Sequence, residues 1–211
     1  MNRRAHIEKL KKMTGVAMFA ALAYLSMIIL RIPDIGGFLT MDFKDVIITV
    51  SAMFFGPLSA VFISVLVPFL ESMTISGTGV YGLIMNILSS LTFSLTASVI
   101  YKYKKTLNGA IIALYISTLA TVSLMMVMNI LITPLYMGVE RSFVISYIPS
   151  LLLPFNLAKS LMNSAFAMLL YKPVSLAMKR ARLIRGEFDT KFSKKSVIII
   201  ARCARIEVRY P

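Results

Sequence analysis

The chain has 211 residues, of which 58% are hydrophobic, and it carries a formal net charge of +14. Soluble domains are closer to half apolar, and the mean hydropathy of +0.80 points to long apolar runs rather than one soluble core. The single cysteine, Cys203, excludes an intrachain disulfide and a cysteine metal cluster, and the single histidine, His6, precedes the first apolar run. In a soluble protein this charge would suggest nucleic acid, but here the basic residues flank apolar runs, so we expect neither nucleic acid nor a metal.

The apolar runs predict an all-α membrane protein with six transmembrane helices. A helix that crosses the hydrocarbon core needs about 20 residues. The spans are expected at 14–31, 44–55, 57–73, 80–101, 108–135 and 149–178. Gly56-Pro57 separates the second span from the third, because glycine suits a helix end and proline a first turn. Both of these spans are short, so we expect tilted or partly covered helices there.

Lysine and arginine are distributed unequally between the two sides that six spans define. One side holds the basic clusters within residues 3–12, 102–105 and 179–185. The other side holds only Arg31, Lys44 and Arg141, together with Asp34, Asp42, Asp45, Glu71 and Glu140. Because basic loops stay in the cytoplasm, both termini are predicted to be cytoplasmic. Residues 1–185 are expected to form the membrane domain, and 186–211 form a tail to which we assign no role.

Lys159 is the most informative residue of the sixth span. A charged group in hydrocarbon costs several kcal/mol by insertion scales. One reading is that Lys159 snorkels to the outer interface. The other is that it faces a polar cavity and donates to a ligand. Asn156 and Asn163 favour the second reading, because positions three and four residues away share a helix face with Lys159.

Two further asparagines lie deep in apolar runs. Asn129 in the fifth span is followed by Thr133, Pro134 and Tyr136. It needs a partner, which is either another helix, a water molecule or a ligand. The proline is expected to loosen the helix end and release backbone carbonyls. Asn86 in the fourth span permits the same readings; packing between helices is favoured there, and Asn86 stays a candidate ligand group.

The first outer loop, IPDIGGFLTMDFKDV at 32–46, is too apolar for an ordinary solvated loop. Gly36-Gly37 would let it bend back as a lid over a pocket. Asp42 and Asp45 are expected to cap the second span at its N-terminus. Capping is the preferred role for Asp45, whereas Asp42 is also a candidate for the pocket. The apolar candidates for the lid are Phe38, Leu39 and Met41.

Small residues recur in the first span, where Ala17 and Ala21 are four positions apart. Such a pair lets another helix approach closely. That helix belongs either to the same bundle or to a separate membrane subunit.

The sequence has no phosphate-binding loop, no HExxH motif and no pair of acids within the spans. An ATPase or a membrane hydrolase would therefore lack its chemistry. A proton-coupled carrier would need buried acids, and Glu71 alone comes near a span, at an outer end. Binding is better supported than catalysis, so we expect no enzyme.

Four segments resemble one known family. They are FLTMDFKDV at 38–46, FFGPLSAVF at 54–62, NILITPLY at 129–136 and LPFNLAKSLMNSAFAMLLYKPVS at 153–175. In this order they resemble the riboflavin-specific S components of energy-coupling factor (ECF) transporters. The combination of PFN-x-x-K with F-L-x-x-D is the more specific part, whereas G-P-L is shared by several S-component families.

The resemblance implies a six-helix subunit of a bacterial plasma membrane that binds riboflavin from the outside. It would act with a transmembrane coupling subunit, which Ala17 and Ala21 would contact, and with two cytoplasmic ATPases that hydrolyse ATP. No cofactor of its own is implied. Asn129, Asn156 and Lys159 would suit the polar edge of the flavin ring. Phe38, Leu39, Met41 and Tyr136 would form apolar walls, and Thr40 or Asn163 would meet the ribityl hydroxyls.

Two alternatives stay open from the sequence alone. An S component for another vitamin or precursor would share the fold, because the pocket sets the ligand. A stand-alone carrier or a membrane scaffold would work without ATPase partners.

Overall fold

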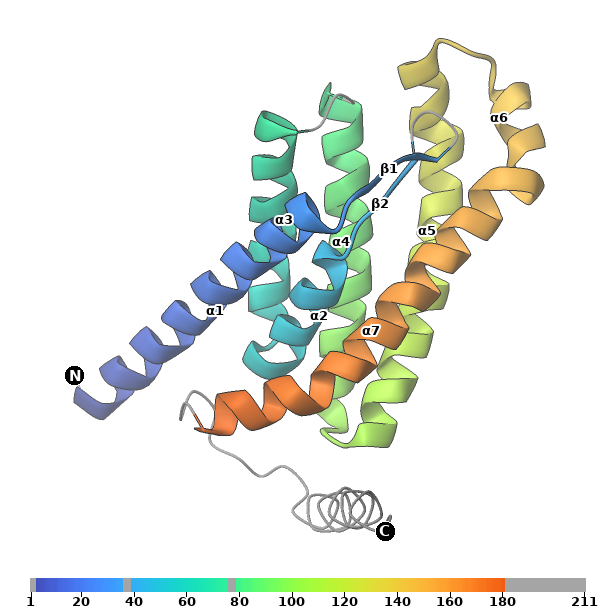
Figure 1. Ribbon diagram of the computed structural model, residues 1–211. Coiled ribbons are helices and arrows are strands. Elements are labelled where there is room, and N and C mark those ends of the chain that lie inside the picture. Colours follow the sequence, from blue (N-terminus) through green and yellow to red (C-terminus); the bar gives the residue numbers. More distant parts are fainter. Residues whose placement is uncertain (1–2, 36–38, 76–78, 181–211) are drawn as a thin grey trace, which may run out of the picture.

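A computed structural model describes residues 3–35, 39–75 and 79–180 (Figure 1). The chain forms α1 (Arg3–Ile29), a hairpin of β1 (Ile32–Ile35) and β2 (Leu39–Met41), α2 (Lys44–Phe55), α3 (Pro57–Thr74), α4 (Gly79–Tyr103), α5 (Leu107–Met137), α6 (Arg141–Tyr147), a π-helical stretch (Ile148–Leu152) and α7 (Leu153–Arg180). The two strands are antiparallel, with Ile32 opposite Met41. The tail at 186–211 and Phe38 lie outside the described residues.

All six expected spans are helical, but they differ in length. Within the described part of the chain, five helical segments are long and apolar enough to cross a membrane, and the last of these runs continuously from Arg141 to Met178. The exception is α2, whose 12 residues measure about 18 Å against a hydrocarbon core of about 30 Å. Ten of those residues are buried, so the predicted cover over this short helix is confirmed.

Three boundaries differ from the expectation. The first helix begins at Arg3 rather than at residue 14, so the basic N-terminal stretch continues the span as helix. The expected outer loop is a β-hairpin, because pairing satisfies backbone groups that a bent apolar loop would leave open. Arg141 opens α6 instead of lying in a loop.

The centre of the bundle is α2, which packs against α1, α3, α4 and α7. Gly15 of α1 lies against the ring of Phe55, so a side chain at that position would collide with it. On the other flank, serines bring α3 and α4 together, with Ser64 and Ser94 hydroxyls 2.9 Å apart. Small residues thus let the long helices close around the short one.

The bundle has two distinct ends. The first residues of α1, the last residues of α7 and the α4–α5 connection lie at one end in Figure 1. The α4–α5 connection carries Lys104 and Lys105, which are exposed. The strands β1 and β2, α6, the end of α3 and the start of α4 lie towards the opposite end. The segments that carry the basic clusters therefore lie at one end of the bundle and the hairpin at the other, as the distribution of lysine and arginine predicts.

Candidate functional site

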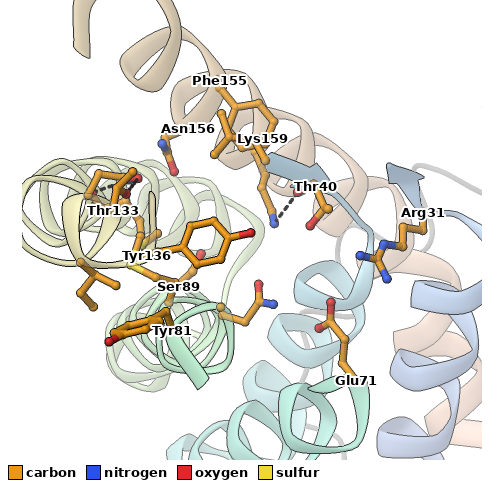
Figure 2. A pocket seen from close by; sticks show the side chains of 17 residues that line it. Arg31, Thr40, Glu71, Tyr81, Ser89, Thr133, Tyr136, Phe155, Asn156 and Lys159 are labelled. Atoms are coloured by element: carbon orange, nitrogen blue, oxygen red, sulfur yellow. Dashed lines mark hydrogen bonds between the residues drawn. The ribbon is translucent and has the colours of Figure 1, made fainter. Parts of the chain in front are cut away.

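A pocket opens at the hairpin end of the bundle, and Figure 2 shows its lining. The empty space, including solvent at its mouth, is about 790 Å³. The lining residues are Arg31, Leu39, Thr40, Glu71, Tyr81, Gly82, Met85, Asn86, Ser89, Met125, Asn129, Ile132, Thr133, Tyr136, Phe155, Asn156 and Lys159. They come from the hairpin region, the end of α3, the start of α4, the end of α5 and the start of α7. Polar and aromatic groups from distant parts of the sequence therefore meet in one cavity.

Lys159 points inward, not towards the outer interface. Its Nζ donates to the backbone oxygen of Thr40 at 3.2 Å and to Asp42 Oδ2 at 3.1 Å. The side chain is 12% exposed. Figure 2 shows it reaching towards the hairpin, beside Asn156 and Phe155. The snorkelling reading is wrong, because a partner inside the protein satisfies the ammonium better than a long reach to water.

Behind Lys159 lies a buried ion cluster. Lys44 is 0% exposed, and its Nζ lies 2.9 Å from Asp42 Oδ2 and 2.9 Å from Glu71 Oε2. Asp42 therefore accepts from two ammonium groups, while Glu71 has Lys44 behind it and faces the pocket. The sequence predicts Lys44 in an outer loop, which is wrong, because Lys44 is the first residue of α2. Glu71 lies near the end of α3, as expected, and both side chains are buried. The charges join the hairpin end of α2 to α3 and α7.

The two lysines also determine the charge state of Asp42, which lies between β2 and α2. Burial alone would raise the pKa of this carboxyl group, but the ammonium groups of Lys159 and Lys44 outweigh burial and lower the pKa well below its usual range. Asp42 is therefore a carboxylate that holds Lys159 in place. It is not among the pocket-lining residues, so its role is to position a lining residue.

Neither aspartate caps α2. Phe43 occupies the N-cap position and no side chain caps the helix. Asp45 instead accepts a hydrogen bond from Ser90 of α4 and another, at 3.4 Å, from Asn163 of α7. Asp45 is buried between helices, so its carboxylate bonds to neighbouring helices rather than to backbone N–H groups. Asn163 is consequently held beneath the pocket and does not line it.

The asparagines that do line the pocket are held by their own helices. Asn129 Nδ2 donates to Met125 O at 2.7 Å, and Thr133 Oγ1 donates to Asn129 Oδ1 at 3.0 Å. Asn156 Nδ2 donates to Leu152 O at 2.8 Å. An asparagine amide can make four hydrogen bonds. Each side chain is therefore oriented by one or two local bonds and keeps capacity for a ligand.

Most of the predicted binding residues meet in this pocket, and a few do not. Leu39, Thr40, Asn86, Asn129, Tyr136, Asn156 and Lys159 line it, whereas Met41, Asp42 and Asn163 do not. The sequence favours a packing role for Asn86, yet the residue belongs to the lining. The polar or aromatic residues that sequence reasoning missed are Arg31, Glu71, Tyr81, Ser89, Thr133 and Phe155. Phe155 and Thr133 adjoin predicted residues and were the ones that local spacing could have found.

The two alanines of α1 face away from the bundle. Ala17 and Ala21 are exposed, whereas Ala20 and Ala23 on the other side of the helix are buried. The reading that Ala17 and Ala21 pack within this bundle is therefore wrong. Their exposed small surface is available to another helix.

An apolar helix bundle with a polar cavity at one end defines an integral membrane protein that binds a small molecule. More specifically, this chain belongs to the family of ECF transporter substrate-specific components, whose model matches residues 11–175. It is accordingly a multi-pass membrane transport component and not an enzyme, and the family resemblance read from the sequence is confirmed.

Similar proteins cover nearly the whole membrane domain. The riboflavin transporter RibU of Staphylococcus aureus (strain TCH60) is 29% identical over 185 residues, or 84% of this chain and 97% of that protein. The riboflavin transporter FmnP of Bacillus subtilis (strain 168) is 25% identical over 174 residues, or 77% of this chain and 91% of that protein. A solved structure of the S component of a bacterial ECF transporter has a TM-score of 0.69 at 26% identity, covering 81% of this chain and 99% of that chain.

Proposed function

We propose that this protein is the riboflavin-binding subunit of an ECF-type vitamin uptake transporter. It lies in a bacterial plasma membrane with both termini in the cytoplasm, and it takes riboflavin from the outer side. A coupling subunit and two ATPases drive release inside. The relatives of this chain that are named riboflavin transporters support the ligand, and the basic residues at the terminal end of the bundle support the orientation.

The observation that carries the proposal is that Lys159 and two asparagines line the same pocket. Lys159, Asn129 and Asn156 bring a cation and two amides to one cavity. The flavin ring has a dense edge of carbonyl and imide groups, which need both donors and acceptors. Tyr81, Tyr136 and Phe155 offer the flat apolar surfaces that a ring system needs. A flavin therefore matches both the polar and the aromatic residues of the pocket.

Titration with riboflavin tests this function directly. The purified chain in detergent is expected to quench flavin fluorescence at a stoichiometry of one ligand per chain, and it is expected to co-purify with yellow colour. The control is riboflavin titrated into detergent alone. A folded protein that leaves flavin fluorescence unchanged would contradict the ligand, and a screen of other vitamins would follow within the same family.

The exposed pair on α1 is proposed to contact the coupling subunit. Changing both Ala17 and Ala21 to leucine is expected to leave riboflavin affinity within about twofold, since neither residue lines the pocket. Uptake by cells that contain the complete transporter is expected to fall at least tenfold, because bulky side chains separate the two helices. Ala165→Leu, at an exposed position of α7, is the matched control. Lost riboflavin binding in the double variant would instead mean that the pair supports the bundle.

A further inference from the structure

The end of the bundle that lies opposite the pocket is strongly basic. Its exposed lysines form two groups, which are Lys9, Lys11 and Lys12 in the first turns of α1 and Lys102, Lys104 and Lys105 around the α4–α5 connection. Arg180 is exposed at the end of α7. Of the described acidic side chains, only Glu8 lies at this end, since the others belong to the hairpin end. The described part of this end therefore presents an excess of positive charge.

The first turns of α1 are amphipathic. Ile7 and Leu10 are both exposed, and they share one side of the helix because they are three positions apart. Lys12 follows Ile7 by five residues, which places it about 140° further around the helix. Figure 1 shows these turns projecting sideways from the bundle. A basic amphipathic helix of this kind is typical of a membrane surface.

An exposed tyrosine lies among the lysines at the end of α4. Tyr103 is 83% exposed, whereas Tyr101, two residues earlier, is buried. Tyrosine and lysine at the end of a span are typical of the membrane–water interface, where the apolar part of each side chain meets acyl chains and the polar tip meets headgroups. The α4–α5 connection therefore has the composition of a membrane-surface contact, as the first turns of α1 do.

The two lysine groups lie on different sides of the same end. Figure 1 shows the first turns of α1 well apart from the α4–α5 connection. A planar layer of headgroups would meet both groups at once, whereas a protein that docks on one side of the bundle would meet only one of them. The proposed orientation places this end at the cytoplasmic leaflet, whose surface carries negative charge. Lipid headgroups therefore match both the distribution and the sign of the charge.

We propose that the two lysine groups bind the anionic headgroups of phospholipids, and that the protein prefers such lipids to zwitterionic ones. Every phospholipid has a phosphate that can accept from an ammonium group, but in a zwitterionic headgroup a second cation cancels the attraction. One lysine near an anionic membrane surface contributes about fivefold in affinity. The pocket lies at the opposite end of the bundle, so this inference does not depend on which vitamin the pocket binds.

The test measures the lipid preference of the purified chain without any other subunit. The protein is reconstituted in phosphatidylcholine vesicles that contain a trace of spin-labelled phosphatidylglycerol or spin-labelled phosphatidylcholine. Electron paramagnetic resonance gives the fraction of each lipid held at the protein surface. The wild-type protein is expected to prefer phosphatidylglycerol by about fivefold or more, and to lose much of this preference at high salt because ionic attraction is screened.

Substitution of the lysines assigns the preference to this end. The variant in which both lysine groups are changed to glutamine is expected to bind the two lipids about equally. Changing the same lysines to arginine keeps the charge and is expected to keep the preference. Arg141→Gln removes a charge from an exposed position at the hairpin end and is expected to change nothing. Circular dichroism and size-exclusion chromatography check that each variant is folded.

The outcomes separate this inference from the proposed function. A folded wild-type protein that holds the two lipids equally overturns the inference and leaves the riboflavin proposal standing. If uptake by the complete transporter then falls in the glutamine variant, the basic end serves a protein partner instead. A preference that persists in the folded glutamine variant also overturns the inference, because the lipid would bind elsewhere. A wild-type protein that binds no riboflavin overturns the proposed function alone.

Discussion

Lys44→Met is expected to lower the free energy of unfolding by about 3–5 kcal/mol, the usual cost of breaking a buried ion pair from one side. The change leaves Glu71 buried with no ion-pair partner among the described residues, and it leaves Asp42 with Lys159 alone. Unfolding in detergent, followed by far-ultraviolet circular dichroism during a denaturant titration, measures the effect. Lys105→Met, at an exposed position, is the matched control.

A second variant identifies the source of that loss. In the double variant Lys44→Met, Glu71→Gln the uncompensated carboxylate is removed, so part of the stability is expected to return. A Lys44→Met protein as stable as the wild type would show that water or rearrangement replaces the ion pairs. The cluster would then not be what holds α2 beneath the pocket.

Lys159→Ala is expected to weaken riboflavin binding by about 10- to 150-fold. The change removes a charged donor from the lining, where such a bond contributes about 1.5–3 kcal/mol, and it also frees the hairpin from α7. Quenching of flavin fluorescence during titration gives the dissociation constant. Lys105→Met again serves as the control, and it is expected to bind as the wild type does.

Substitutions of the two lysines are expected to affect different properties of the protein. Lys44 does not line the pocket, so a Lys44→Met protein that stays folded is expected to lose stability more than affinity. Lys159 is partly exposed and lines the pocket, so its loss is expected to act on affinity first. A Lys159→Ala protein that binds riboflavin at wild-type strength would place the flavin outside this cavity.

Long hydrophobic runs and the basic clusters made the helix order predictable from sequence. The apolar runs predict each of the six expected helices, because a chain in lipid must satisfy its backbone within helices. Asn129, Asn156 and Lys159 were recognisable as site candidates because a polar group in such a run is expensive. The helical spacing of Asn156, Lys159 and Asn163 correctly put all three on an inward face, with the first and second in the lining.

The charges near helix ends show where local pattern is insufficient. Lys44, Glu71 and Arg31 each lie beside a helix terminus, where a charged residue is ordinarily solvated. In the folded chain the hairpin crosses this end of the bundle, and α2 begins inside it rather than at its surface (Figure 1). Whether such a charge is buried depends on segments distant in the sequence. The prediction that Asp45 caps α2 is wrong for the same reason.

The sequence by itself determined the class of this protein, its helix order and the polar residues of α5 and α7 that the pocket uses. Those features follow from the cost of polar groups in hydrocarbon. That cost depends on the residues of each helix by itself, so it can be read from the local sequence. Only the tertiary structure decided that Lys44 joins Asp42 and Glu71, that Asn163 stays outside the pocket lining, and that Arg31 belongs to that lining. These are matters of contact between elements, since burial and charge pairing depend on which helices close around α2.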